Sequence, residues 1–282
     1  MFAGTARYLK AQLGVPILCA VQGEELFLDA LSEPHRTRAR EVLRERSRDV
    51  DGFIAPCQYY ADFMAKYLAV PPKRFHVVKL GVSPPDSAEP AARVGPFTIG
   101  YLARVAPEKG LHLLIEACRL LSVKVGPQAI RLKVAGWLGQ QDRPYFEAAL
   151  SQVRSAGLEA SFSYEGEVDS SGKSDFLNSI HMLCVPTAFH EPKGLYVLEA
   201  LSHGVPVVQP AHGAFPELVE ATGGGLLVTP DSASELAAAM AQLMEDDDRR
   251  VELGSRGRRA VIDRFNDDVM AANTMAVYEQ YL

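Results

Sequence analysis

The stretch from residue 97 to residue 136, FTIGYLARVAPEKGLHLLIEACRLLSVKVGPQAIRLKVAG, decides the fold of this 282-residue chain. Its opening apolar run (97–103) is typical of a buried strand, residues 110–121 have the apolar spacing of an amphipathic helix, and residues 131–136 predict the next strand. Near-continuous apolar strands that alternate with helices indicate a parallel sheet covered on both faces. The stretch therefore predicts part of a doubly wound α/β domain.

The same alternation continues to the end of the chain. The further strands that we predict are 161–166, 181–186, 205–210 and 224–230. The further helices are one around 143–156, a short one before 181, one at 194–204 that ends at Gly204, and three within 231–281. A domain of this kind binds its ligands beyond the carboxyl ends of its strands.

The first 96 residues repeat the pattern in a shorter form. Strands are predicted at 14–21, 51–56 and 74–81, and helices at about 3–12, 33–48 and 57–68. Residues 82–97 carry four prolines and no apolar period, which indicates a linker. We expect a partial N-terminal domain at 1–90, a C-terminal domain at 91–265, and a helix at 266–282 that packs back toward the N-terminal domain.

The predicted N-terminal sheet has an open edge. Three strands make about half of a doubly wound domain, and an uncovered strand exposes unpaired backbone groups. We therefore expect either a partner or a missing N-terminal segment to complete this sheet.

Composition excludes several classes of protein. Apolar residues make up 48% and charged residues 23%, the balance of an ordinary globular protein, and the net charge of −6 argues against general nucleic-acid binding. Four cysteines are too far apart for a zinc knuckle or a CxxC pair and lie in apolar runs, so we predict buried free thiols in a reducing compartment. No apolar run approaches the length of a membrane span, and the start lacks a signal-peptide pattern. These features predict a cytoplasmic protein.

Two glutamates eight residues apart, Glu191 and Glu199, stand out in HEPKGLYVLEALSHGVPVV (190–208). Pro192 and Gly194 prevent an unbroken helix, so Glu191 is expected in a loop and Glu199 about one turn inside the helix that follows. An ionised carboxylate only accepts hydrogen bonds, which suits a ligand rich in hydroxyl groups.

The start of that helix predicts an anion site. The backbone N–H groups of Gly194, Leu195 and Tyr196 are expected at its first turn, where unpaired donors and a partial positive charge favour phosphate. A site that binds a diphosphate at its centre and sugar hydroxyls at a carboxylate on each side fits a nucleotide sugar.

Two cations follow the strand at 97–103. Arg104 and Lys109 lie on one loop between strand and helix, where they can neutralise a diphosphate leaving group without a metal. The alternative is that Pro107 and Glu108 only begin a helix and that Lys109 is a solvated charge.

Together these motifs resemble those of the retaining GT-B glycosyltransferases of group 1, the glycogen-synthase-like family GT4. The matching segments are R-x-x-x-x-K-G at 104–110, E-x7-E at 191–199, the small-residue strand entry at 204–208, GAFPELVE at 213–220 and GGGLLV at 223–228. The resemblance implies a GT-B-like α/β fold of two Rossmann-like parallel-sheet domains, the N-terminal one incomplete, because the family's opening βα units have no counterpart here.

The resemblance also implies a role for each matched residue. Arg104 and Lys109 would contact the donor diphosphate and stabilise charge on the departing nucleotide, and Glu191 would lie beside the donor sugar. These three are the catalytic candidates; no side-chain nucleophile is assigned. The implied donor-binding residues are Glu199 on the ribose, Gly194, Leu195 and Tyr196 through their backbone, Val168 near the nucleobase, and Gln22 and His190 near the sugar. Gln22 stands where the family commonly has a histidine, and it cannot titrate near neutral pH.

The expected activity is transfer of a sugar from a nucleoside-diphosphate donor to an acceptor that is a saccharide, a lipid-linked molecule or a small molecule. No cofactor or metal is expected, and Asp246, Asp247 and Asp248 are interpreted as a charge cluster at a helix start. Two alternatives stay open: a non-catalytic nucleotide-sugar-binding fragment or half of a split enzyme, and a nucleotide-sugar epimerase.

Arginines recur every four residues at Arg36, Arg40, Arg44 and Arg48. This stripe is either a solvated helix face or a contact surface for an anionic acceptor or a membrane. The second interpretation would make the protein peripheral to a membrane.

Overall fold

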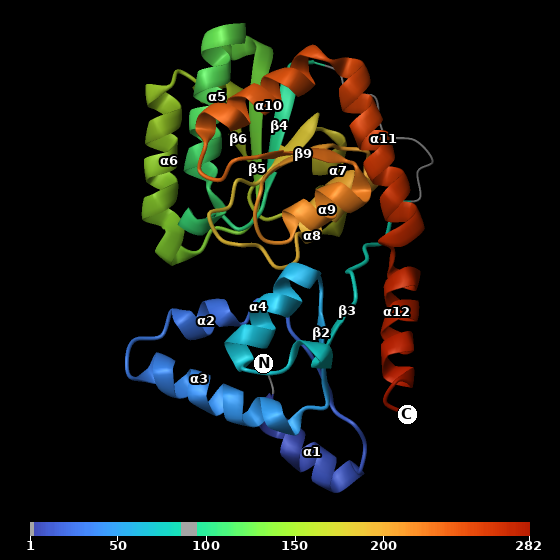
Figure 1. Cartoon of the computed structure of the whole chain (residues 1–282). Helices are drawn as coiled ribbons and strands as arrows, with labels where there is room; N and C mark the ends of the chain where they lie inside the picture. Colours follow the sequence, from blue (N-terminus) through green and yellow to red (C-terminus); the bar gives the residue numbers. More distant parts are fainter. Residues whose placement is uncertain (1–2, 86–94) are drawn as a thin grey trace. The chain divides into compact units, whose positions relative to one another are not determined.

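The computed structural model describes residues 3–85 and 95–282, and the chain divides into two compact units (Figure 1). The first unit comprises Met1–Gly81, Glu191–Lys193 and Phe265–Leu282, and the second comprises Val82–His190 and Gly194–Arg264. Most of the predicted linker falls on residues 86–94, which lie outside the described residues. Each unit contains a parallel sheet with helices packed against it.

The second unit contains a six-stranded sheet in the order β6-β5-β4-β7-β8-β9, and all its strand pairs are parallel. Its strands are β4 (Phe97–Leu102), β5 (Ile130–Ala135), β6 (Phe162–Tyr164), β7 (Met182–Cys184), β8 (Val207–Pro210) and β9 (Gly225–Val228). The strand order reverses between β4 and β7. This is the switch point at which doubly wound sheets bind ligands, beyond the carboxyl ends of the strands.

Helices cover both faces of this sheet (Figure 1). One face carries α5 (Leu111–Val125), α6 (Arg143–Ser155) and α10 (Ala233–Glu245), whose apolar residues share one core with β4 and β5. On the other side lie α7 (Ser170–Asn178), α8 (Leu195–Ser202) and α9 (Phe215–Thr222), and α11 (Asp247–Arg264) contacts α8 and α9. All six residues of β4 are buried, as expected for a central strand.

The first unit contains a three-stranded parallel sheet in the order β1-β2-β3. Its strands are β1 (Leu18–Ala20), β2 (Gly52–Ala55) and β3 (Phe75–Val77), and its helices are α1 (Ala6–Leu13), α2 (Glu25–Asp29), α3 (His35–Arg46), α4 (Gln58–Leu68) and α12 (Asp267–Glu279). Phe53, Tyr60 and Met64 form the centre of its core. After α12, the hydroxyl of Tyr281 lies 2.8 Å from Nε2 of His76, so the end of the chain belongs to this unit.

The doubly wound α/β prediction is confirmed, and each predicted strand is present. Several strands are shorter than their apolar runs; the run at 14–21 is paired only from Leu18 to Ala20. Two helices were not predicted, α2 and α9. Helix α2 has only five residues and exposes Phe27, so no apolar period marks it.

The cysteine prediction is confirmed for three of the four residues. Cys57, Cys118 and Cys184 are buried free thiols, and burial raises the pKa of Cys118 to about 12. The prediction is wrong for Cys19, which is only partly buried because it lies on the edge strand β1. Within residues 3–85 and 95–282, no helix combines the length and apolarity that a membrane crossing needs.

Candidate functional site

The two loops that carry the predicted motifs meet at the switch point of the six-stranded sheet. One loop follows β4 and the other follows β7. The hydroxyl of Thr187 donates to the carbonyl of Glu108 at 2.7 Å, and the N–H of Ala188 donates to the same carbonyl at 3.0 Å. The backbones approach so closely that a Cβ at Gly110 would overlap the carbonyl oxygen of Pro186. Motifs far apart in the sequence are therefore neighbours in this unit.

Lys109 lies against aromatic residues of the second loop and helix. Its Nζ is 5.8 Å from the ring centres of both Phe189 and Tyr196. A cation over an aromatic face is attracted by the ring quadrupole, and this attraction holds the ammonium next to the first turn of α8. The structure thus brings Lys109 and Tyr196 together.

Arg104 is held by two carboxylates that the sequence interpretation did not include. It forms an ion pair with Glu108, and its Nη1 lies 3.7 Å from Oδ2 of Asp142. Arg104 and Glu108 are four residues apart, but they do not share a helix, because a short 3-10 helix begins only at Pro107; the spacing therefore gives no helical ion-pair signal. Asp142, which is buried, carries no such signal.

Helix α8 begins as the glycine pattern predicts. Gly194 precedes the helix with φ of 65°, a left-handed conformation, and a Cβ there would lie 2.7 Å from Cδ1 of Leu218. The left-handed backbone favours glycine, and the Leu218 side chain would have to shift to admit a Cβ. Leu195 and Tyr196 form the first turn, at the end of the helix that carries a partial positive charge.

Glu199 is the fifth residue of α8 and makes an ion pair with a lysine that sequence reasoning missed. Nζ of Lys173 on α7 lies 2.6 Å from Oε1 of Glu199. Asp169 caps the start of α7, and its side chain accepts from the N–H of Gly172 at 2.8 Å. Val168 directly precedes this cap, so the predicted nucleobase region and Glu199 are linked through α7.

Glu191 and Gln22 belong to the first unit. Glu191 is buried, and one of its carboxylate oxygens accepts from the N–H of Lys193 at 3.4 Å. Gln22 is exposed, and its N–H donates to Glu24 at 2.8 Å. A Cβ on the next residue, Gly23, would lie 3.3 Å from Pro192, so the loop after β1 reaches the segment that carries Glu191.

His190 stacks on a second histidine that was not predicted. The rings of His190 and His212 are 4.6 Å apart and nearly parallel. His212 lies after β8, and its Nε2 donates to the carbonyl of Thr187 at 2.9 Å. Burial, followed by the nearby His190, lowers the pKa of His212 below its ordinary value.

The arginine stripe on α3 is largely engaged by its own unit. Arg36 pairs with Glu33 at 2.7 Å, Arg40 pairs with Asp29 at 2.6 Å, and Arg44 donates to a backbone carbonyl at 2.9 Å. These contacts favour a solvated helix face over an anion-binding surface.

The aspartate cluster behaves as a helix start. The side chain of Asp246 accepts from the N–H of Arg249 at 2.9 Å, and Asp247 and Asp248 lie in the first turn of α11. Acidic residues at this position are stabilised by the helix dipole. Across the described parts of the chain, no group of three or more histidine, cysteine and acidic side chains is arranged to hold a metal ion.

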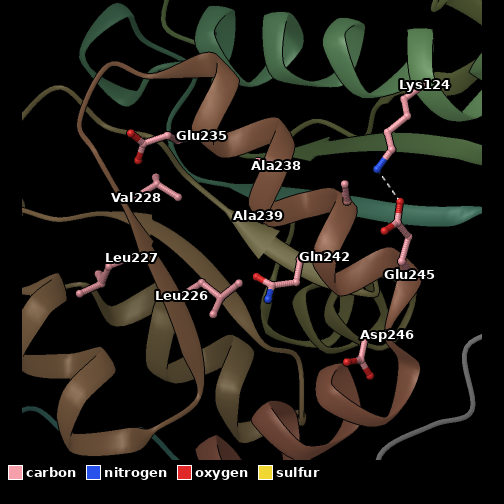
Figure 2. Close-up of a pocket in the computed structure, with 11 residues that line it drawn as sticks. Lys124, Leu226, Leu227, Val228, Glu235, Ala238, Ala239, Gln242, Glu245 and Asp246 are labelled. Carbon is pink, nitrogen blue, oxygen red and sulfur yellow. Dashed lines mark hydrogen bonds and ion pairs between the residues drawn. The ribbon is translucent and has the colours of Figure 1, made fainter.

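An open groove of about 640 Å³ lies elsewhere in the second unit, along β9 and α10 (Figure 2). Leu226, Leu227 and Val228 form its apolar side, and Lys124 pairs with Glu245 at 2.7 Å at its rim. None of the predicted site residues lines it.

Fold and site together define a doubly wound α/β protein with cations and a helix start gathered at the switch point of its larger sheet, a place suited to a phosphorylated ligand. Residues 83–260 match the family model described as glycosyl transferases group 1. This chain belongs to the group 1 glycosyl transferase family, as its motifs predicted.

Two curated relatives are similar over much of the chain. The MMP alpha-(1->4)-mannosyltransferase of Mycolicibacterium hassiacum is 29% identical over 251 residues, which cover 85% of this chain and 56% of the relative. The putative colanic acid biosynthesis glycosyltransferase WcaL of Escherichia coli K12 is 30% identical over 214 residues, which cover 72% of this chain and 50% of that protein. The chain spans about half the length of these relatives.

A solved structure shows the same fold. Anabaena Alr3699/HepE in complex with UDP superimposes with a TM-score of 0.81 at 19% identity, covering 99% of this chain and 75% of that protein. The predicted GT-B-like fold with two Rossmann-like parallel sheets is confirmed.

Proposed function

We propose that this chain acts as a retaining glycosyltransferase that moves a sugar from a nucleoside-diphosphate donor to an acceptor hydroxyl. One observation carries the proposal: the loop with Arg104 and Lys109 is hydrogen-bonded to the loop that leads into α8. This meeting gathers two cations and a helix N-terminus where a diphosphate is best stabilised.

The proposed chemistry follows from the charge that develops on the leaving group. As the bond between the sugar's C1 and the phosphate oxygen breaks, negative charge grows on the departing nucleoside diphosphate. Arg104, Lys109 and the N–H groups of Gly194, Leu195 and Tyr196 would stabilise that charge without a metal or cofactor. The acceptor oxygen forms the new bond to C1 on the same face, and its proton passes to the leaving phosphate oxygen.

The remaining candidates would hold the donor. Glu199 would accept hydrogen bonds from the ribose, Val168 would lie near the nucleobase, and Glu191, Gln22 and His190 would lie near the transferred sugar. The similar proteins include one named as GDP-mannose-dependent and one solved with UDP, which supports a nucleotide-sugar donor without choosing its base. Three buried free thiols support a reducing, cytoplasmic setting.

Calorimetric titration with UDP, GDP and ADP tests the proposed site. Lys109→Ala and Glu199→Gln each remove a charge-assisted hydrogen bond, so we expect affinity for the preferred nucleotide to fall about 10- to 100-fold. Lys124→Ala removes a surface lysine outside the site and should bind as the wild type does. Full-strength binding by both site variants would refute the assignment.

A second candidate is nucleotide-sugar binding without transfer, the alternative that the sequence motifs left open. Measurement of nucleotide release with an acceptor panel of saccharides and lipid-linked sugars distinguishes the two. Steady release above the rate without acceptor supports transfer. Binding without release supports the second candidate.

A further inference from the structure

The ion pair between Lys173 and Glu199 connects two helices close to the proposed donor site. Nζ of Lys173 lies 2.6 Å from Oε1 of Glu199, and the two side chains are 36% and 25% exposed. A half-buried pair is screened less by salt than a fully exposed one. A carboxylate has about four acceptor positions, so a single lysine contact leaves room for ribose hydroxyls.

The backbone around this pair is fixed by neighbouring contacts. Nε2 of His203 lies 3.2 Å from the hydroxyl of Ser174, the residue after Lys173, and Nδ1 of His203 lies 2.9 Å from the carbonyl of Glu199. The hydroxyl of Ser202 donates to the same carbonyl at 2.7 Å. These contacts fix the positions of helices α7 and α8 relative to each other. The part of Glu199 that could still change conformation is its long side chain.

Restricting that side chain before a ligand arrives lowers the cost of binding. A glutamate loses rotamer freedom when it is held in a single geometry. Because the ion pair already orients the carboxylate, less freedom is lost when the ribose hydroxyls bind, as in any preorganised site.

We propose that Lys173 is a positioning residue that orients Glu199, and that through it the site selects donors with an intact ribose diol. This inference rests on the proposed function, because it takes Glu199 as the ribose ligand. A site built to hydrogen-bond a hydroxyl strongly disfavours an analogue that lacks it. If the Glu199 carboxylate loses its orientation, both the affinity for the nucleoside diphosphate and the selectivity for its ribose diol should fall.

The test compares two ligands, the nucleoside diphosphate among UDP, GDP and ADP that binds most tightly and its 2′,3′-dideoxy analogue. Calorimetry gives the ratio of their dissociation constants for the wild type, Lys173→Met, Lys173→Arg and Glu199→Gln. We expect the wild type to prefer the ribonucleotide by about tenfold or more, and Glu199→Gln to lose most of that preference. Lys173→Met should reduce the ratio about three- to tenfold, and Lys173→Arg, which keeps the cation, should restore most of it.

Lys124→Met is the matched control, because Lys124 forms a similar ion pair with Glu245 outside the site, and it should leave the ratio unchanged. Urea unfolding of each variant shows that the fold is retained. If Glu199→Gln loses the preference while Lys173→Met keeps it, or if Lys173→Met weakens both ligands equally, the inference is wrong and the proposed function stands. If the wild type binds no nucleoside diphosphate, the proposed function fails and the inference with it.

Discussion

The close approach of the two motif loops at Gly110 can be tested with a single methyl group. Gly110 has φ of 74°, and a Cβ there would overlap the carbonyl oxygen of Pro186. Gly110→Ala therefore imposes two costs: a left-handed backbone for a residue with a side chain, about 1 kcal/mol, and a forced shift of neighbouring backbone, about 1–3 kcal/mol. The free energy of unfolding should fall by about 2–4 kcal/mol.

Gly157→Ala separates the two costs. Gly157 also has a left-handed backbone, φ 66°, but a Cβ there would meet nothing within 4 Å. The Gly157→Ala variant should therefore lose only about 1 kcal/mol of its free energy of unfolding. Urea unfolding of both variants gives the difference, and nucleotide titration of each should show weakened binding only for Gly110→Ala, since only that change displaces the loop that carries Lys109. Equal destabilisation by the two alanines would show that the loops are not in tight contact.

Two further predictions concern titratable groups. Burial and the nearby His190 hold the pKa of His212 below its ordinary value, so His212 binds a proton more readily in the unfolded chain than in the folded one. The free energy of unfolding should therefore fall as the pH drops from about 7.5 to about 5. His212→Gln should flatten this dependence in urea unfolding at several pH values, and an unchanged slope would exclude His212 as a cause. Tyr60→Phe removes the hydroxyl that accepts from the N–H of Gly23 and donates to buried Glu25. Thermal or urea unfolding should show a loss of about 1–3 kcal/mol in the free energy of unfolding, because buried polar groups lose their partner. A loss under about 0.5 kcal/mol would show that these hydrogen bonds do not stabilise the fold.

The fold could be predicted because its signals are local. The apolar runs and helical spacings between residues 97 and 264 are properties of short segments, and each produced its element. Strand lengths could not be predicted equally well, because a strand ends where its neighbour stops pairing with it. Residues 14–17 continue the apolar run before β1, but the ladder with β2 begins at Leu18.

The candidate site, too, could be predicted from the sequence only in part. Glycines and charges at regular spacing revealed the two loops and the start of α8. The residues that contact Arg104, Glu199 and His190 lie on other elements; they are Asp142, Lys173 and His212. Nothing in the sequence around these three distinguishes them from ordinary surface residues.

The carbonyl of Glu108, which accepts from both Thr187 and Ala188, has a consequence for how this protein tolerates change. One oxygen serves as a shared anchor, so an insertion or deletion in either loop would misalign both. Length variation among homologous chains should therefore be rare between Arg104 and Gly110, and it should accumulate in turns that share no such anchor.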